Sequence, residues 1–141
     1  MLIREIIFAF FAVAGFSILF NIPRKLILVA SLIGTVGWGI YSGSLLLGQN
    51  ELVGALLGAF AIGVLGEAFA RFKKVPSSLF IIPGIIPIVP GYGLYYTMLY
   101  AVQNQYQLSV TKGFESLLIT VSIACGLILA ATLFGNKSKL A

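Results

Sequence analysis

Long apolar stretches separated by short polar clusters run through the whole chain. A helix needs about 20 predominantly apolar residues to cross a bilayer, with a range of about 17–25. The pattern predicts five such helices, at about residues 3–20, 26–48, 52–70, 91–107 and 115–134. Because the sequence shows no low-complexity tract and no clear internal repeat, we expect residues 1–141 to form a single transmembrane domain.

One long uncharged stretch, from Val75 to Thr111, is too long for a single helix. Its first part, about residues 76–91, contains the prolines Pro76, Pro83, Pro87 and Pro90. A proline inside a helix costs about 3 kcal/mol, because it removes a backbone donor and clashes with the preceding turn. We therefore expect a broken segment here, which either re-enters the membrane or begins the fourth span.

The composition fits a membrane protein and excludes several other classes. The chain is 60% hydrophobic and 9% charged, with a mean hydropathy of +1.07, whereas a soluble domain is about 25% charged. It has no His and one Cys, so it lacks the ligands of zinc, haem or iron–sulfur sites and the partners of a Ser–His or Cys–His nucleophile. We expect an all-α integral membrane protein that is not an enzyme, has no cofactor or metal site and binds no nucleic acid.

The net charge of +5 is concentrated in short clusters at the ends of the predicted spans. Basic clusters follow the first, third and last spans, at Arg24/Lys25, Arg71/Lys73/Lys74 and Lys137/Lys139. Basic residues beside spans favour the cytoplasmic side of a membrane. The pattern therefore predicts an N-terminus outside and a C-terminus in the cytoplasm.

The proline- and glycine-rich segment is the main candidate for a substrate pathway. Unpaired backbone groups in hydrocarbon cost several kcal/mol, so broken backbone is tolerated where it is buried in protein or lines a cavity. Transporters use such breaks to present backbone groups to their substrates. The candidate pathway residues in this segment are Pro83, Gly84, Pro87, Pro90 and Gly91. An ordinary kink or an interfacial loop is the structural alternative.

Tyrosines follow this segment at helical spacing. Tyr92, Tyr96 and Tyr100 recur every four residues and would share one helix face. Hydroxyls inside a span need hydrogen-bond partners, so Tyr92 and Tyr96 are further candidates for the pathway. A packing face or an interfacial aromatic belt explains the same spacing.

Glu67 is the only carboxylate inside an otherwise apolar run, which makes it a candidate for proton coupling. Arg71 follows four residues later, so an ion pair on one helix face is the alternative interpretation.

Small residues in the second and third spans predict close helix packing. They include the pairs Gly39/Gly43 and Gly54/Gly58.

Three motifs together resemble the threonine/serine exporter family, specifically the small membrane subunit of its split, two-chain form. They are Phe20-Asn21-Ile22-Pro23, Gly34-x-x-Gly37-Trp38-Gly39, and Ile82-Pro83-Gly84-Ile85-Ile86-Pro87-Ile88-Val89-Pro90-Gly91 with Tyr96 beyond. The resemblance covers nearly the whole chain in order and spacing.

The resemblance implies a subunit of a secondary transporter in a bacterial inner membrane. Such a transporter would export small amino acids or dicarboxylates, threonine/serine or succinate-like, driven by the proton motive force. It also implies a larger membrane subunit as partner. The alternatives are a non-transporting membrane scaffold subunit and a homo-oligomeric channel whose pore loop is the proline-rich segment.

Overall fold

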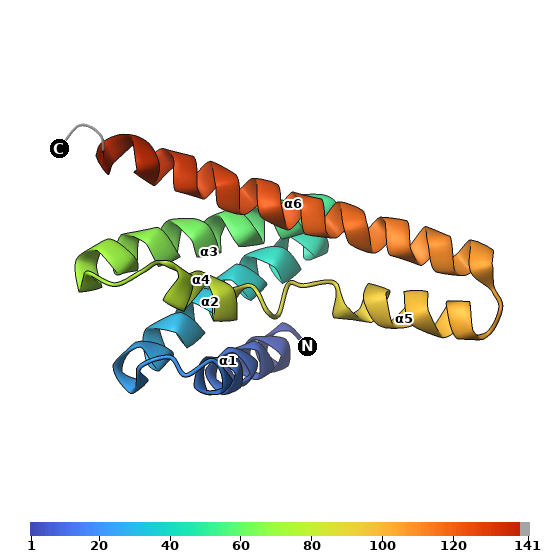
Figure 1. Ribbon diagram of the computed structural model, residues 1–141, viewed down its shortest axis with the longest axis horizontal. Coiled ribbons are helices and arrows are strands. Elements are labelled where there is room, and N and C mark those ends of the chain that lie inside the picture. Colours follow the sequence, from blue (N-terminus) through green and yellow to red (C-terminus); the bar gives the residue numbers. More distant parts are fainter. Residues whose placement is uncertain (139–141) are drawn as a thin grey trace.

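The computed structural model describes the backbone of residues 1–138 and the side chains of residues 1–134, and all regular structure within that part is helical (Figure 1). The helices are α1 (Leu2–Leu19), α2 (Arg24–Leu46), α3 (Glu51–Lys73), α4 (Ser78–Gly84), α5 (Gly91–Val102) and α6 (Tyr106–Ser138). The predicted all-α class is confirmed. Lys139 and the side chain of Lys137, from the last basic cluster, lie outside the described residues.

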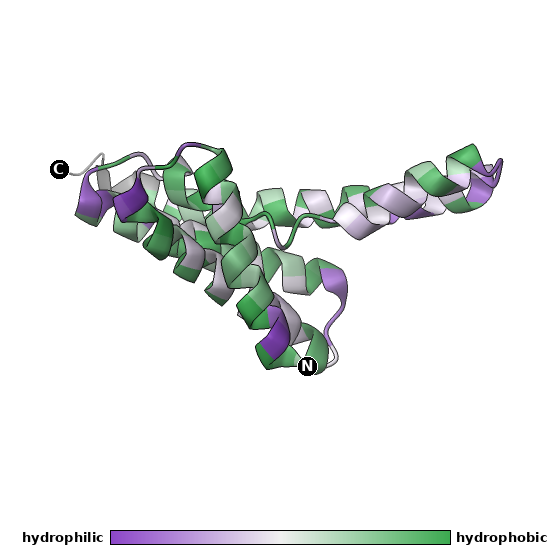
Figure 2. Ribbon diagram, turned by 90° about the horizontal axis from the view of Figure 1, so that it is seen from below, coloured by the Kyte–Doolittle hydropathy of each residue, from purple (hydrophilic) through white to green (hydrophobic). Residues whose placement is uncertain are grey.

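Four helices, α1, α2, α3 and α6, are long and apolar enough to cross a membrane. The first three correspond to the spans predicted at 3–20, 26–48 and 52–70. Figure 2 shows hydrophobic residues along these helices and the most hydrophilic ones near helix ends and in connecting loops. The chain is thus built as a membrane bundle.

Local signals set the ends of these helices. The Asn50 side chain accepts a hydrogen bond from the Val53 amide at 2.9 Å and caps the start of α3. α3 stops at Lys73 because Lys74 adopts a left-handed conformation, with φ of 55°. Asn21, with φ of 56°, makes the turn between α1 and α2, since Asn tolerates this conformation better than most residues.

The helices approach one another closely where small residues face each other. At the α3–α6 contact, a Cβ placed on Gly126 would lie 2.5 Å from the carbonyl oxygen of Leu56. A Cβ on Gly63 would lie 2.5 Å from the Cβ of Ala130. Both distances are far below van der Waals contact, so α3 and α6 can pack at this separation only with glycine at these positions.

The two predicted small-residue pairs differ in their role. A Cβ on Gly54 or Gly58 would collide with α2, so this pair lies at a close contact as predicted. A Cβ added to Gly39 or Gly43 would have no neighbouring atom within 4 Å, so this pair makes no close contact within the chain, and its packing against a partner stays a prediction. The spacing of the pair is the same, but it lies on a face of α2 that packs closely against no other helix.

The proline-rich segment passes along the bundle instead of returning to the side where it began. Phe80, in α4, packs against Gly66, and Ile88 packs against Gly58, so the segment runs antiparallel to α3. Residues 85–90 form irregular turns between α4 and α5. The segment joins the Lys73 end of the bundle to the end where α3 begins (Figure 1). The predicted break is therefore present, and it crosses the bundle from one end toward the other.

The two spans expected after the break differ from the structure. The helix predicted at 91–107 is α5, which has 12 residues and is about 18 Å long, too short for a hydrocarbon core of about 30 Å. The helix predicted at 115–134 is the much longer α6, which has 33 residues and begins at Tyr106. α5 and the first part of α6 form a hairpin that extends away from the bundle (Figures 1 and 2).

The reason for this difference lies in two polar features that hydropathy does not resolve. Asn104, with φ of 57°, turns the chain sharply after α5. Lys112 and Glu115 form an ion pair one turn apart, so these charges lie along a continuous helix and do not mark a loop.

We expect Gly126→Ala to destabilise the fold by about 1–3 kcal/mol, the range for overpacking a tight contact. The added methyl group would meet backbone atoms of α3, which cannot rotate away as a side chain can. Thermal unfolding in mild detergent measures the effect. Gly15→Ala is the matched control, because no atom lies within 4 Å of its Cβ position. Equal unfolding temperatures for the two variants would show that the α3–α6 contact tolerates a side chain.

Candidate functional site

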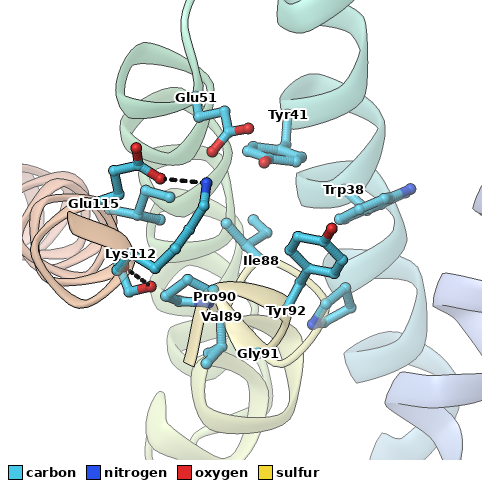
Figure 3. A pocket seen from close by; sticks show the side chains of 14 residues that line it. Trp38, Tyr41, Glu51, Ile88, Val89, Pro90, Gly91, Tyr92, Lys112 and Glu115 are labelled. Atoms are coloured by element: carbon cyan, nitrogen blue, oxygen red, sulfur yellow. Dashed lines mark hydrogen bonds and ion pairs between the residues drawn. The ribbon is translucent and has the colours of Figure 1, made fainter. Parts of the chain in front are cut away.

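A cavity of about 460 Å³ lies where the broken segment meets α2, α3, α5 and α6 (Figure 3). The broken segment supplies residues 87–90, and α5 begins in the cavity wall with Gly91, Tyr92 and Gly93. The cavity is therefore located at the end of the crossing, beside the first residue of α3.

Aromatic side chains from α2 form one wall of the cavity. Trp38 and Tyr41 are one helical turn apart, and their rings pack at 5.2 Å between centroids with 37° between planes. Tyr92 from α5 points into the same space (Figure 3). These rings supply an amphipathic surface with hydroxyl groups at its edge.

Three ionisable side chains from two other helices face the aromatic wall. Lys112 Nζ donates to Glu115 Oε2 at 2.7 Å on α6, and Glu51 lines the cavity from the start of α3. Figure 3 shows the Lys112 ammonium between the two carboxylates. The cavity thus presents two carboxylates and one ammonium, so its side chains carry one net negative charge at neutral pH.

The close approach of α5 to α6 closes the wall of the cavity on that side. A Cβ on Gly93 would lie 2.2 Å from Ser116 Oγ. Ser116 is buried and donates to the Lys112 carbonyl oxygen at 2.8 Å. Glycine at position 93 therefore lets the first turn of α5 lie directly on the turn of α6 that carries Lys112 and Glu115.

The structure places four of the predicted pathway residues in the cavity wall. They are Pro87, Pro90, Gly91 and Tyr92. Pro83 and Gly84 are buried instead in the packing of α4, where the Gly84 backbone lies 3.1 Å from the Cβ position of Gly34. These two residues hold the crossing against α2 and do not line the cavity.

Tyr96 also lies outside the cavity wall, although the predicted tyrosine stripe exists. The rings of Tyr92 and Tyr96 are 4.5 Å apart and those of Tyr96 and Tyr100 are 5.7 Å apart. Tyr92 raises the pKa of Tyr96 above its usual value, mainly through side-chain hydrogen bonding. Tyr96 packs against Tyr92, the tyrosine that faces the cavity, and does not line the cavity itself.

Glu67 does not line the cavity and does not pair with Arg71. It lies sixteen positions after Glu51 on α3, which is about 24 Å along the helix. Arg71 instead donates to the carbonyl oxygen of Phe134 and lies over the Phe134 ring, 5.0 Å from its centroid. The expected ion pair is thus replaced by a contact that ties α3 to α6.

Sequence reasoning misses the charged and aromatic half of the cavity. The missed residues are Trp38, Tyr41, Glu51, Lys112, Glu115 and Ser116. Glu51 belongs to a polar turn in the sequence pattern, and Lys112 and Glu115 resemble a balanced loop. One signal in the sequence could have identified these three residues as candidates. Their charges lie outside the basic clusters that explain the membrane topology.

Comparison with known proteins gives a family but no structural relative. A sequence model described as "Threonine/Serine exporter, ThrE" matches residues 5–133, which includes every cavity residue named above. No solved structure matches the chain.

We expect Lys112→Ala and Glu115→Ala to change the unfolding temperature little, by less than about 4 °C. The side chains of this pair are 38% and 53% exposed, so water screens their attraction. Thermal unfolding in detergent, beside Gly126→Ala as a destabilised reference, measures this. A loss as large as that of the reference would mean that this pair within α6 contributes strongly to stability despite its exposure.

Proposed function

Since this chain belongs to the threonine/serine exporter family, we propose that its cavity binds the exported amino acid. Family membership makes the chain part of an amino-acid exporter in a membrane, and a transporter rather than an enzyme. The observation that carries the proposal is that one ammonium and two carboxylates share a single cavity with aromatic walls. Its volume, about 460 Å³, falls in the usual range for small-molecule sites, about 300–1,000 Å³.

These charges match a zwitterion. The carboxylate of an amino acid would pair with Lys112 in place of Glu115, and its ammonium would pair with Glu51 and the Glu115 that Lys112 releases. Charge-assisted hydrogen bonds of this kind are the stronger ones in proteins. The side-chain hydroxyl of threonine or serine would lie at the aromatic wall formed by Trp38, Tyr41 and Tyr92.

A succinate-like dicarboxylate fits this cavity less well. It would bring two negative charges to a site that already has more carboxylates than ammonium groups. Like charges at close range oppose binding, so the cavity favours amino acids over dicarboxylates.

The broken segment supports a substrate pathway whose parts can move relative to one another. Pro87, Pro90, Gly91 and Tyr92 form the part of the pathway that touches substrate, and Pro83 and Gly84 anchor it. We place Tyr96 behind Tyr92 as a supporting residue of the same pathway. Broken crossings allow one part of a transporter to move against another.

The charge pattern supports an orientation in a bacterial inner membrane. Arg24 and Lys25 begin α2, and Arg71 and Lys73 end α3, at the same end of the antiparallel pair (Figure 1). This end would face the cytoplasm by the positive-inside rule, with the N-terminus outside. The cavity would then open toward the outer side. Glu67, near the cytoplasmic end, is the proposed group for coupling to the proton motive force.

The α5–α6 hairpin supports a larger membrane subunit as partner. Among the described helices, α5 contacts only α6, and none of its residues is buried. Met98 and Val102 are 71% and 81% exposed on it. A second membrane chain packed here would cover these side chains. This feature also fits the second candidate function, a scaffold subunit that stabilises a transporter without carrying substrate.

We expect Glu51→Gln and Lys112→Gln each to weaken threonine binding by about tenfold or more, because each removes one charge that pairs with the zwitterion. Isothermal titration of the purified protein, with any chain that accompanies it, measures the affinity. Threoninol, which lacks the carboxylate, separates the roles: Lys112→Gln should abolish the preference for threonine over threoninol, and Glu51→Gln should keep it.

Glu67→Gln is the matched control, since it makes the same change on α3 outside the cavity. We expect it to bind threonine as the wild type does and to lose the dependence of export on a pH gradient. Wild-type affinity in both cavity variants would contradict the proposed site.

We expect native mass spectrometry of the chain, extracted from its own membrane in mild detergent, to find a larger membrane protein at fixed stoichiometry. The exposed face of α5 is the physical reason, because an apolar helix without intramolecular cover on most sides favours association. A homo-oligomer without another chain would contradict the partner and favour a channel. A heteromeric complex whose export is unaffected by Glu51→Gln and Lys112→Gln would favour the scaffold.

A further inference from the structure

A second cavity, of about 250 Å³, lies on the other side of the aromatic wall, between α1 and α2, and it opens to the surface beside Phe8, which is 64% exposed. It is lined by Glu5, Phe8, Ala9, Ala12, Trp38 and Pro87. Trp38 and Pro87 also line the first cavity. These two residues are therefore the wall that the two cavities share.

The two sides of this wall differ in chemistry. The first cavity holds Glu51, Lys112 and Glu115, whereas Glu5 is the one charged residue in the lining of the second. The Ser42 hydroxyl donates to Glu5 Oε2 at 3.4 Å, a long contact that leaves this carboxylate weakly held. The rest of the second lining is apolar, so it suits a small aliphatic side chain better than a second set of charges.

The indole of Trp38 has an unused polar group at this wall. Its Nε1 is buried and has no hydrogen-bond partner among the described residues. Figure 3 shows Nε1 on the side of the indole that faces away from Tyr41 and Tyr92, toward α1. A buried donor without a partner favours any ligand or rearrangement that supplies an acceptor.

The two halves of the wall also differ in how they are attached to the chain. Pro87 belongs to the backbone of the break, and its ring fixes its φ angle. Trp38 is a side chain on a regular helix, so its indole can turn about its own side-chain torsions without any change in the backbone. Rotation of the indole is therefore the simplest movement that would join the two cavities.

We propose that Trp38 is the size-selective partition of the transport pathway, separating the charged cavity from a second cavity that receives the amino-acid side chain. The inference rests on the proposed function of the first cavity. In this arrangement the charged groups hold the amino acid by its ammonium and carboxylate. The indole limits how large a side chain can extend toward α1, and its N–H donates to the polar groups of a small one.

The test compares threonine with leucine in competition binding to the purified protein, with any chain that accompanies it. We expect Trp38→Ala to raise the affinity for leucine relative to threonine by about tenfold or more, since removing the indole opens room for the extra methylene groups. Trp38→Phe keeps most of the bulk and removes the N–H, so it should weaken threonine binding without improving leucine. Phe72→Ala, an exposed aromatic residue outside both cavities, is the matched control and should leave the ratio unchanged.

Each outcome has a separate meaning. An unchanged ratio in Trp38→Ala, with threonine still bound, overturns the partition and leaves the proposed function intact. Failure of the wild type to bind any amino acid overturns the proposed function and this inference together.

A second measurement does not depend on the folding of Trp38→Ala. Ala9, which is 5% exposed and lines the second cavity, is replaced by Cys in a Cys125→Ser background. The measurement is how much each amino acid slows the labelling of this thiol by a small reagent. We expect leucine to slow it less in the Trp38→Phe variant than threonine slows it in the wild type. Labelling that neither amino acid affects in any background shows that no substrate reaches the second cavity and overturns the inference.

Discussion

The need to pair backbone groups along a crossing that contains Pro83, Pro87 and Pro90 governs this structure. In hydrocarbon an unpaired amide costs several kcal/mol, and each proline disrupts the regular helical solution. The segment instead forms local turns, in which backbone amides donate to carbonyl oxygens a few positions earlier in the sequence. The donors are the amides of Ile85, Ile86, Ile88, Val89 and Gly91. The break is therefore an ordered structure with these donors paired, and it can be surrounded by protein.

This ordered break determines the composition of the neighbouring helices. The broken segment, with α4 at its start, lies close against α2 and α3 at positions where those helices lack side chains. Gly34 faces Gly84, Gly58 faces Ile88, and Gly66 lies against α4. Small residues in the second and third spans thus accommodate the break. The crossing then ends at Pro90, where α5 turns outward and leaves the cavity between the end of the break and α6.

The sequence alone predicts the parts of this fold that depend on local chemistry. Apolar runs predict α1, α2 and α3, and the prolines predict the break. Both signals can be read locally, because the length of an apolar run and the effect of a proline each depend on a single segment of the chain. The α5–α6 hairpin could not be predicted in this way: an uncharged run resembles a span, and the turn at Asn104 is a short-range backbone event. Half of the cavity is missed for a different reason. Glu51 and Lys112 are far apart in the chain, and their meeting depends on how α6 packs against α3.

The charged side of the cavity has the energetic properties that a transport site needs. A carrier must release what it binds. In the empty state, the charges of its binding site therefore need partners whose attraction is weak enough for substrate to replace them. Lys112 and Glu115 satisfy this requirement, because an exposed ion pair one helical turn apart keeps both charges paired at little cost to separate them. A buried pair would resist exchange, since each charge would have to be desolvated without compensation. In the proposed function, the exposure of this pair is what lets Lys112 exchange Glu115 for a substrate carboxylate.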